Sequence, residues 1–189
     1  MIKDLKIAVL VDGDNIPSKY ITEMMQEIAK YGTPTIKRIY GDWTKPHLAK
    51  WKSVLLENAI SPIQQYSYTT GKNATDSAMI IDAMDILYSN KVDAFCLASS
   101  DSDFTKLATR LREAGLQVYG IGEKKTPDPF IVACDKFIYL EILKTHSEKS
   151  GDGTKTSKVN LYNITPKVIK MLKSSVSDAA DDDGWAFLG

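Results

Sequence analysis

The sequence is poor in cysteine and histidine, has no excess of charge of either sign, and contains no long apolar run. Only two cysteines in 189 residues argue against a disulfide-rich secreted scaffold. Cys96 and Cys134 both lie in apolar segments, which favours buried free thiols over a disulfide. No apolar run approaches the ~20 residues of a membrane-spanning helix. The formal net charge is zero, so binding of nucleic acid would depend on a local basic patch.

The first residues lead directly into a strand-like run, so we expect no signal peptide. Together with the few cysteines, this start predicts a cytoplasmic protein. Hydrophobic residues make up 43% of the chain, enough for a real core and too many for wholesale disorder.

Strand-like and helix-like segments alternate along most of the chain. Residues 7–11 read Ile-Ala-Val-Leu-Val, which is typical of a strand buried on both faces. The expected strands are 7–11, 35–40, 61–66, 94–98 and 116–121, and the expected helices are 18–31, 46–58, 75–89 and 104–114. This alternation predicts an α/β fold: a three-layer, Rossmann-like open parallel sheet with helices on both faces.

The alternation stops near residue 145, which we take as the end of a first domain, 1–145. Residues 146–158 are rich in Ser, Gly, Lys and Thr and are interpreted as a flexible linker. Residues 159–189 begin with a helical apolar stripe and end in exposed-looking aromatic residues. Because that stripe and those aromatics need a surface to cover them, we expect a tendency to self-associate, for which a homodimer is one form.

Two aspartates follow strands that we expect to be neighbours. Asp12 comes directly after the first strand, and Asp101 follows the fourth. In open parallel sheets, ligands bind beyond the carboxyl ends of the strands where the strand order reverses. With the common order 3-2-1-4-5, assumed from topology, Asp12 and Asp101 face each other there.

Asp76 is expected to point inward. It shares a helical stripe with apolar residues that follow it by three, four, seven, eight and eleven positions. An inward carboxylate costs several kcal/mol unless a positive group meets it. Asp82 and Asp85 lie off this stripe and are expected to be solvated.

A divalent metal ion would explain this gathering of acids. Taken singly, each acid has an ordinary structural reading as a turn, a helix cap or a solvated first-turn residue. Together their charges would repel one another, and a bound cation removes that penalty. Oxygen ligands suit Mg²⁺ or Mn²⁺, and the lack of a His/Cys cluster argues against zinc.

Several motifs, in order, resemble the NYN domain, a branch of the PIN-like nucleases. They are Val11-Asp12-Gly13-Asp14-Asn15, Tyr40-Gly41-Asp42-Trp43, Lys72-Asn73-Ala74-Thr75-Asp76, Ser99-Ser100-Asp101-Ser102-Asp103-Phe104 and the run from Gly120 to Pro127. The resemblance spans roughly residues 5–142. It implies a metal-dependent endoribonuclease that hydrolyses RNA phosphodiester bonds. It also implies that Asp12, Asp76, Asp101 and Asp103 are catalytic metal ligands, and that Asn15 positions the scissile phosphate or a water. The tail from about Leu161 resembles the first half of an OST-HTH (LOTUS) RNA-binding domain.

RNA contacts are expected on the same rim of the sheet. Trp43 would either stack on a base or cover the sheet end. Ser99 is also assigned to substrate binding. Four lysines on loops of this rim form a candidate phosphate patch: Lys45, Lys72, Lys124 and Lys125. His47 is taken as a helix-start residue without a catalytic role.

Two other functions remain open at this point. Asp12-Gly13-Asp14-Asn15-Ile16 resembles the opening of HAD-type phosphatases, with Asp12 as nucleophile, although Ile16 stands where Thr or Val is usual. The other alternative is a non-catalytic RNA-binding adaptor, against which the full set of acids argues.

Overall fold

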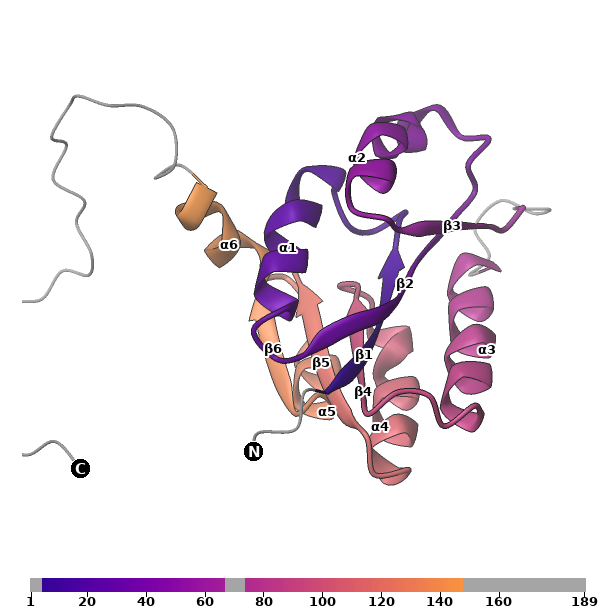
Figure 1. Ribbon diagram of the computed structural model, residues 1–189, viewed down its shortest axis with the longest axis vertical. Helices are drawn as coiled ribbons and strands as arrows, with labels where there is room; N and C mark the ends of the chain where they lie inside the picture. The colour runs from indigo at the N-terminus through magenta and orange to yellow at the C-terminus, as the bar shows by residue number, and fades with distance from the viewer. Residues whose placement is uncertain (1–4, 67–73, 148–189) are drawn as a thin grey trace, which may run out of the picture. The chain divides into compact units, whose positions relative to one another are not determined.

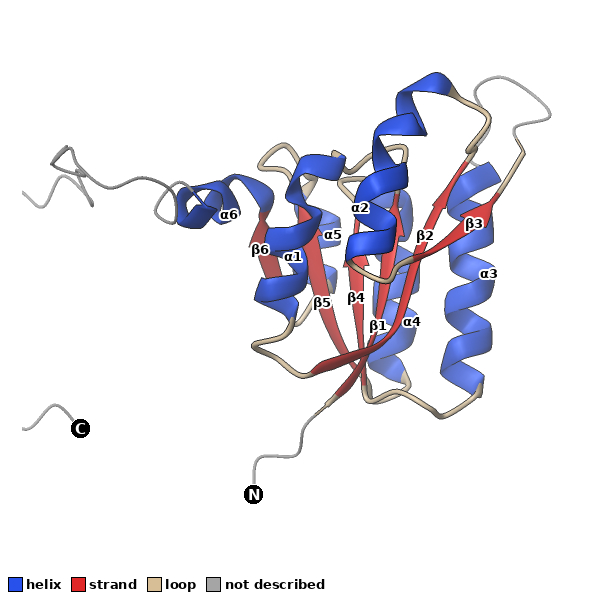
Figure 2. Ribbon diagram, turned by 45° about the horizontal axis from the view of Figure 1, so that its top comes forward, coloured by secondary structure: helices blue, strands red, loops and turns tan. Residues whose placement is uncertain are grey.

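The computed structural model describes residues 5–66 and 74–147, which form a parallel sheet covered by helices on both faces (Figures 1 and 2). All paired strands run in the same direction, in the order β3-β2-β1-β4-β5-β6. The strands are β1 (Lys6–Asp12), β2 (Thr33–Gly41), β3 (Ser61–Gln64), β4 (Ala94–Ala98), β5 (Gln117–Gly122) and β6 (Lys136–Tyr139).

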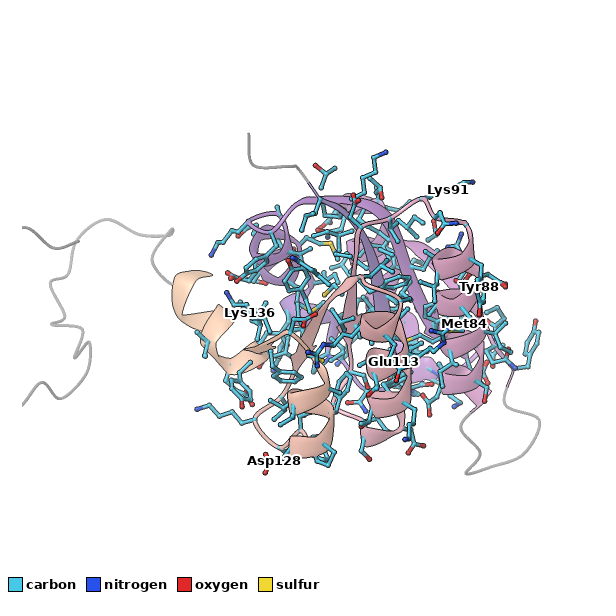
Figure 3. The ribbon with its side chains drawn as sticks, turned by 90° about the horizontal axis from the view of Figure 1, so that it is seen from below. Met84, Tyr88, Lys91, Glu113, Asp128 and Lys136 are labelled. Carbon is cyan, nitrogen blue, oxygen red and sulfur yellow. The ribbon has the colours of Figure 1, made fainter. Side chains whose placement is uncertain are left out.

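Helices cover both faces of this sheet. One face carries α1 (Ile21–Ile28), α2 (Trp51–Glu57) and α6 (Leu140–Ser147), and the other carries α3 (Ala74–Tyr88), α4 (Thr105–Glu113) and α5 (Asp128–Ala133). Short 3-10 turns precede three of them: η1 (Ser18–Tyr20), η2 (Pro46–Lys50) and η3 (Ser102–Phe104). Figure 3 shows α3, with Met84 and Tyr88, beside α4, with Glu113.

The alternation of side chains along β1 divides the core into two layers. Ile7, Val9 and Val11 pack with residues of α1, α2 and α6, whereas Ala8 and Leu10 pack with residues of α3, α4 and α5. All five side chains are fully buried, as a central strand of a three-layer fold requires. The predicted three-layer α/β fold is therefore confirmed.

Most predicted elements are confirmed, with shifted ends. The assumed order of the first five strands is correct, and β6 adds a sixth strand at the edge. The third strand ends at Gln64 rather than at residue 66, and the helix expected from residue 18 begins with a 3-10 turn. The elements α5, β6 and α6 were not predicted, and α6 extends to Ser147, into the range interpreted as linker.

One expectation for α3 is wrong. Asp85 is exposed as predicted, but Asp82 is half-buried and bound to other side chains rather than simply solvated. Its two carboxylate oxygens accept hydrogen bonds from the guanidinium of Arg38 and from the hydroxyl of Tyr40. Both partners lie on β2, so this interaction fastens α3 to the sheet. The carboxylate lies off the apolar stripe, yet the side chains of the neighbouring strand reach it.

Both cysteines are buried free thiols, as expected. Within residues 5–66 and 74–147, no helix is both long and apolar enough to cross a bilayer. Lys72 and residues 148–189 lie outside the described residues, so the expectations for that lysine, for most of the linker and for the OST-HTH-like segment remain predictions.

Candidate metal centre at the carboxyl edge of the sheet

The loops that follow β1 and β4 meet at the carboxyl edge of the sheet. The two strands are neighbours, with Val11 paired to Ala98 at their ends. Asp12 is the last residue of β1, and Asp101 begins the turn that leads through η3 into α4. The first turn of α3 lies at the same edge (Figure 2). The fold thus brings together three segments that are far apart in the sequence.

Three carboxylates converge at this edge: Asp76, Asp101 and Asp103, which we call the three-aspartate cluster. Each offers one oxygen, and these oxygens all lie within 4.8 Å of one another. Asp76 belongs to the first turn of α3. Asp101 caps η3, since its side chain accepts a 2.9 Å hydrogen bond from the backbone N–H of Asp103. The cap fixes the relative positions of these two carboxylates.

The cluster is electrostatically strained. Burial and then the charges of Asp101, Asp103 and Asp14 raise the pKa of Asp76 from 3.8 to about 6. Repulsion of this kind is relieved by a cation or by protonation. A set of three carboxylate oxygens, half-buried to exposed, suits a hard divalent cation that keeps some of its water. The residues present therefore fit the Mg²⁺ or Mn²⁺ expected from the sequence.

Asp12 is not among the three carboxylates of this cluster, although its charge interacts with that of Asp76, and its role as a metal ligand remains a prediction. Its side chain is only 3% exposed. One oxygen accepts a 2.9 Å hydrogen bond from the hydroxyl of Ser99, and the other accepts 3.2 Å bonds from the backbone N–H groups of Asp14 and Asn15. Burial, together with the charges of Asp76 and Asp14, raises its pKa to about 7, although the Ser99 bond acts in the opposite direction. A carboxylate enclosed in this way is poorly placed for direct attack on a phosphoryl group, which argues against the phosphatase alternative.

Ser99 has a different role from the one expected. It is fully buried, so it does not present a surface to substrate. Its hydroxyl donates to Asp12 and accepts a 3.1 Å hydrogen bond from the backbone N–H of Asp101. Ser99 therefore joins the ends of β1 and β4 and positions the acids. The neighbouring Ser100 similarly accepts a 2.8 Å hydrogen bond from the N–H of Glu123, which follows β5.

The loop after β1 also approaches β2 closely. The N–H of Gly13 donates a 2.9 Å hydrogen bond to the carbonyl of Tyr40. A Cβ atom at this position would lie 2.8 Å from that carbonyl oxygen, closer than such atoms come in proteins. Glycine is thus required for the tight turn that places Asp14 and Asn15.

Two partners of Asp14 were missed by sequence reasoning. One carboxylate oxygen accepts a 3.0 Å hydrogen bond from the hydroxyl of Thr75, the residue before Asp76. The other lies 3.3 Å from Nε2 of His47, at the start of η2. His47 was assigned no role because nothing in the sequence shows that η2 lies against the loop after β1. Asp14 thus connects the first turn of α3 with η2.

The expected substrate-binding residues are spread over several loops. The indole N–H of Trp43 donates a 3.0 Å hydrogen bond to the carbonyl of Ile63, so this ring covers the sheet end at β3. Lys45 lies in the loop after β2, and Lys124 lies in the loop after β5. Lys125 forms a 2.6 Å ion pair with Glu123, which raises the pKa of this lysine. The ion pair partly neutralises the charge that Lys125 would offer to a phosphate.

Comparisons with known proteins agree with this fold and give the family. A search of curated proteins finds no match to the sequence. Among solved structures, a protein of unknown function from Vibrio parahaemolyticus is similar, with a TM-score of 0.62 and 20% sequence identity. The alignment covers 74% of this chain and 94% of that one, and at this identity it shows a shared fold alone. The NYN domain family matches residues 6–141, which include every acid described above. The chain therefore belongs to the NYN domain family of PIN-like nucleases.

Proposed function

We propose that this chain is a divalent-metal-dependent endoribonuclease that hydrolyses RNA phosphodiester bonds in the cytoplasm. The observation that carries the proposal is the convergence of the three-aspartate cluster at the carboxyl edge of the sheet. Membership of a nuclease family gives the reaction class. A bound divalent cation would relieve the repulsion that raises the pKa of Asp76, which supports a metal-dependent reaction.

The acids and Asn15 have different roles in this proposal. Asp76, Asp101 and Asp103 would hold Mg²⁺ or Mn²⁺, which when bound provides a water of lowered pKa and offsets charge on the phosphate. Asp12 adds negative charge behind the cluster and orders the loop that carries Asn15. Asn15 would then orient the scissile phosphate or a water.

A cleavage assay tests the proposal directly. Labelled single-stranded RNA is incubated with the protein and Mn²⁺, Mg²⁺ or EDTA, beside DNA and a phosphomonoester. We expect cleavage of RNA with either metal and none with EDTA. A circular RNA has no ends, so its linearisation would identify endonucleolytic cutting. Hydrolysis of the phosphomonoester alone would favour a phosphatase, and RNA binding without cleavage would favour an adaptor.

A further inference from the structure

A cavity lies between the loop after β1 and η2. It has a volume of about 410 Å³ and is lined by residues 13–19 and by the start of η2 and α2. We call it the first-loop pocket. A cavity of this size is within the range of small-ligand sites in proteins. The helices that follow its two walls, α1 and α2, lie on the same face of the sheet (Figure 2).

The inner wall of the pocket is apolar and fixed. Ile16, Leu48 and Trp51 line it, and each of these side chains is 2% exposed. All three belong to the core layer beneath α1 and α2. Trp51 is therefore part of a rigid wall and does not project into solvent. These side chains close the bottom of the cavity and expose little surface themselves, while the half-buried Pro17 adds an apolar group beside them.

The rim of the pocket is polar and carries two lysines. Lys19, His47 and Lys50 contribute basic groups, while Asn15 and Ser18 contribute an amide and a hydroxyl. Asp14 is the acid on this rim, and its two oxygens already face the hydroxyl of Thr75 and the ring of His47. The pocket thus combines an apolar wall, cations for a phosphate and an amide that can pair with the edge of a base.

The pocket also shares residues with the loop that binds Asp12. Asp14 and Asn15 are part of its lining, and their backbone N–H groups both donate to Asp12. Asp14 bonds Thr75, which directly precedes Asp76 of the three-aspartate cluster. Asp14 and Asn15 thus belong both to the pocket and to the hydrogen-bond network of the acids.

We propose that the first-loop pocket binds one nucleotide of the RNA strand, next to the phosphate that is cleaved. The base occupies the cavity between the loop of residues 13–19 and η2, and the phosphate of that nucleotide lies against Lys50 and His47. This inference rests on the proposed ribonuclease function for its biological meaning, but the pocket itself can be tested without any cleavage.

The protein contains only two histidines, which makes the test specific. His47 lies on the pocket rim, and His146 lies in α6. The full chain is kept in EDTA at constant pH, and the imidazole proton signals are followed by NMR as adenosine 5′-monophosphate is added. His47→Gln assigns the signals. We expect a saturable change in the His47 signal, no change at His146, and a smaller effect of inorganic phosphate at the same concentration.

Two pairs of variants sharpen the result. Lys50→Ala should weaken the nucleotide about two- to fivefold, the usual value of one exposed charge contact. Lys52→Ala is the matched control, because Lys52 is on the same segment and does not line this pocket. Ser18→Leu should fill the cavity and abolish the His47 response, whereas Ser18→Ala should retain it. Equal thermal unfolding of both Ser18 variants would show that the fold is kept.

Three results would overturn the inference: an unchanged His47 signal, equal responses of both histidines, or equal effects of nucleotide and inorganic phosphate. The last would identify a simple anion site. Because metal is absent from this experiment, its outcome is separate from that of the cleavage assay. A protein that cleaves RNA but shows no His47 response refutes the pocket alone.

Discussion

The buried hydroxyl of Ser99 donates a 2.9 Å hydrogen bond to the carboxylate of Asp12 across two adjacent strands. Asp12 has few other ways to satisfy its charge, because it is nearly inaccessible to solvent. The same hydroxyl receives the N–H of Asp101. One buried side chain thus joins Asp12 and the backbone of Asp101 at the site.

Ser99→Ala is expected to impair both stability and cleavage. Loss of the hydroxyl leaves a buried acceptor partly unsatisfied, which should lower the free energy of unfolding by about 1–3 kcal/mol at pH 8. Cleavage should fall by about 10- to 100-fold, as is usual when the partner of a metal-site residue is removed. Urea unfolding and RNA cleavage measure these effects. Ser102→Ala, at an exposed position in the same loop, is the control and should change neither.

Asp101→Asn should abolish most cleavage and leave the fold intact. The amide oxygen of asparagine can still accept the N–H of Asp103, so the cap of η3 is kept. Only the charge is lost, and we expect a reduction of roughly 100-fold or more. Asp85→Asn, on the exposed side of α3, is the matched control. Near-normal cleavage by a folded Asp101→Asn protein would refute the assignment.

Without metal, the protein should become less stable as the pH rises from about 4 to about 7. Asp12 and Asp76 have raised pKa values in the folded state, about 7 and about 6. Over this interval the folded protein retains protons that the unfolded chain has released. The stability that these groups contribute is full below pH 3.8 and is lost as the pH passes through their folded pKa values. For buried Asp12 the loss is on the order of 4 kcal/mol, and half-buried Asp76 adds less because solvent screens it.

Urea unfolding in EDTA between pH 5 and pH 8 measures this dependence. Asp12→Asn should remove most of the slope, because the amide carries no charge to be desolvated. Equal slopes in the wild-type protein and in Asp12→Asn would show that another group is responsible.

Mg²⁺ or Mn²⁺ should stabilise the protein. A cation that binds only the folded state adds about 2.7 kcal/mol at 100 times its dissociation constant. The melting temperature in several millimolar metal is compared with that in EDTA. Asp103→Asn should lose most of the shift, and Asp85→Asn should keep it. Asp76→Asn should raise the stability of the metal-free protein, because it removes a repelled, half-buried charge. An unchanged wild-type melting temperature would argue against the site.

Removal of residues 148–189 should spare catalysis and weaken binding of long RNA. Every acid assigned to the site lies within residues 12–103, so turnover on a short RNA should be unchanged. The removed segment contains Lys158, Lys167, Lys170 and Lys173, which would attract phosphate. Affinity for RNAs of two lengths measures the difference. Lost turnover on the short RNA would mean that the segment completes the site, and unchanged affinity would mark it as an inert remnant.

The sequence predicted the central sheet because its strands are long, apolar and separated by periodic helices. It did not predict α5, which has six residues, or β6, which has four. A six-residue helix contains less than two turns, so it has no measurable period. Length alone does not explain β6, because β3 is also four residues long and was predicted. The 3-10 start at Ser18 was also missed, since it depends on how the loop after β1 packs.

The site was predicted in part for a similar reason. The assumed strand order predicted that Asp12 and Asp101 lie at the same edge of the sheet. Helical periodicity predicted that Asp76 points inward. Contacts between unrelated loops left no pattern, so the pairing of Asp14 with His47 and the burial of Ser99 were not foreseen. The partners of Asp82 were missed because periodicity tells which side of a helix is apolar but not which strand it lies against.

The fastening of α3 at Asp82 has a mechanical consequence. The α-helix α3 is rigid, and Asp82 binds it to β2. Asp82 follows Asp76 by six residues, which is about 9 Å along the helix axis. A shift of α3 at Asp82 would therefore also move Asp76, whose carboxylate oxygen lies within 4.8 Å of those of Asp101 and Asp103. The interaction of Asp82 with Arg38 and Tyr40 therefore helps to hold Asp76 in place relative to Asp101 and Asp103.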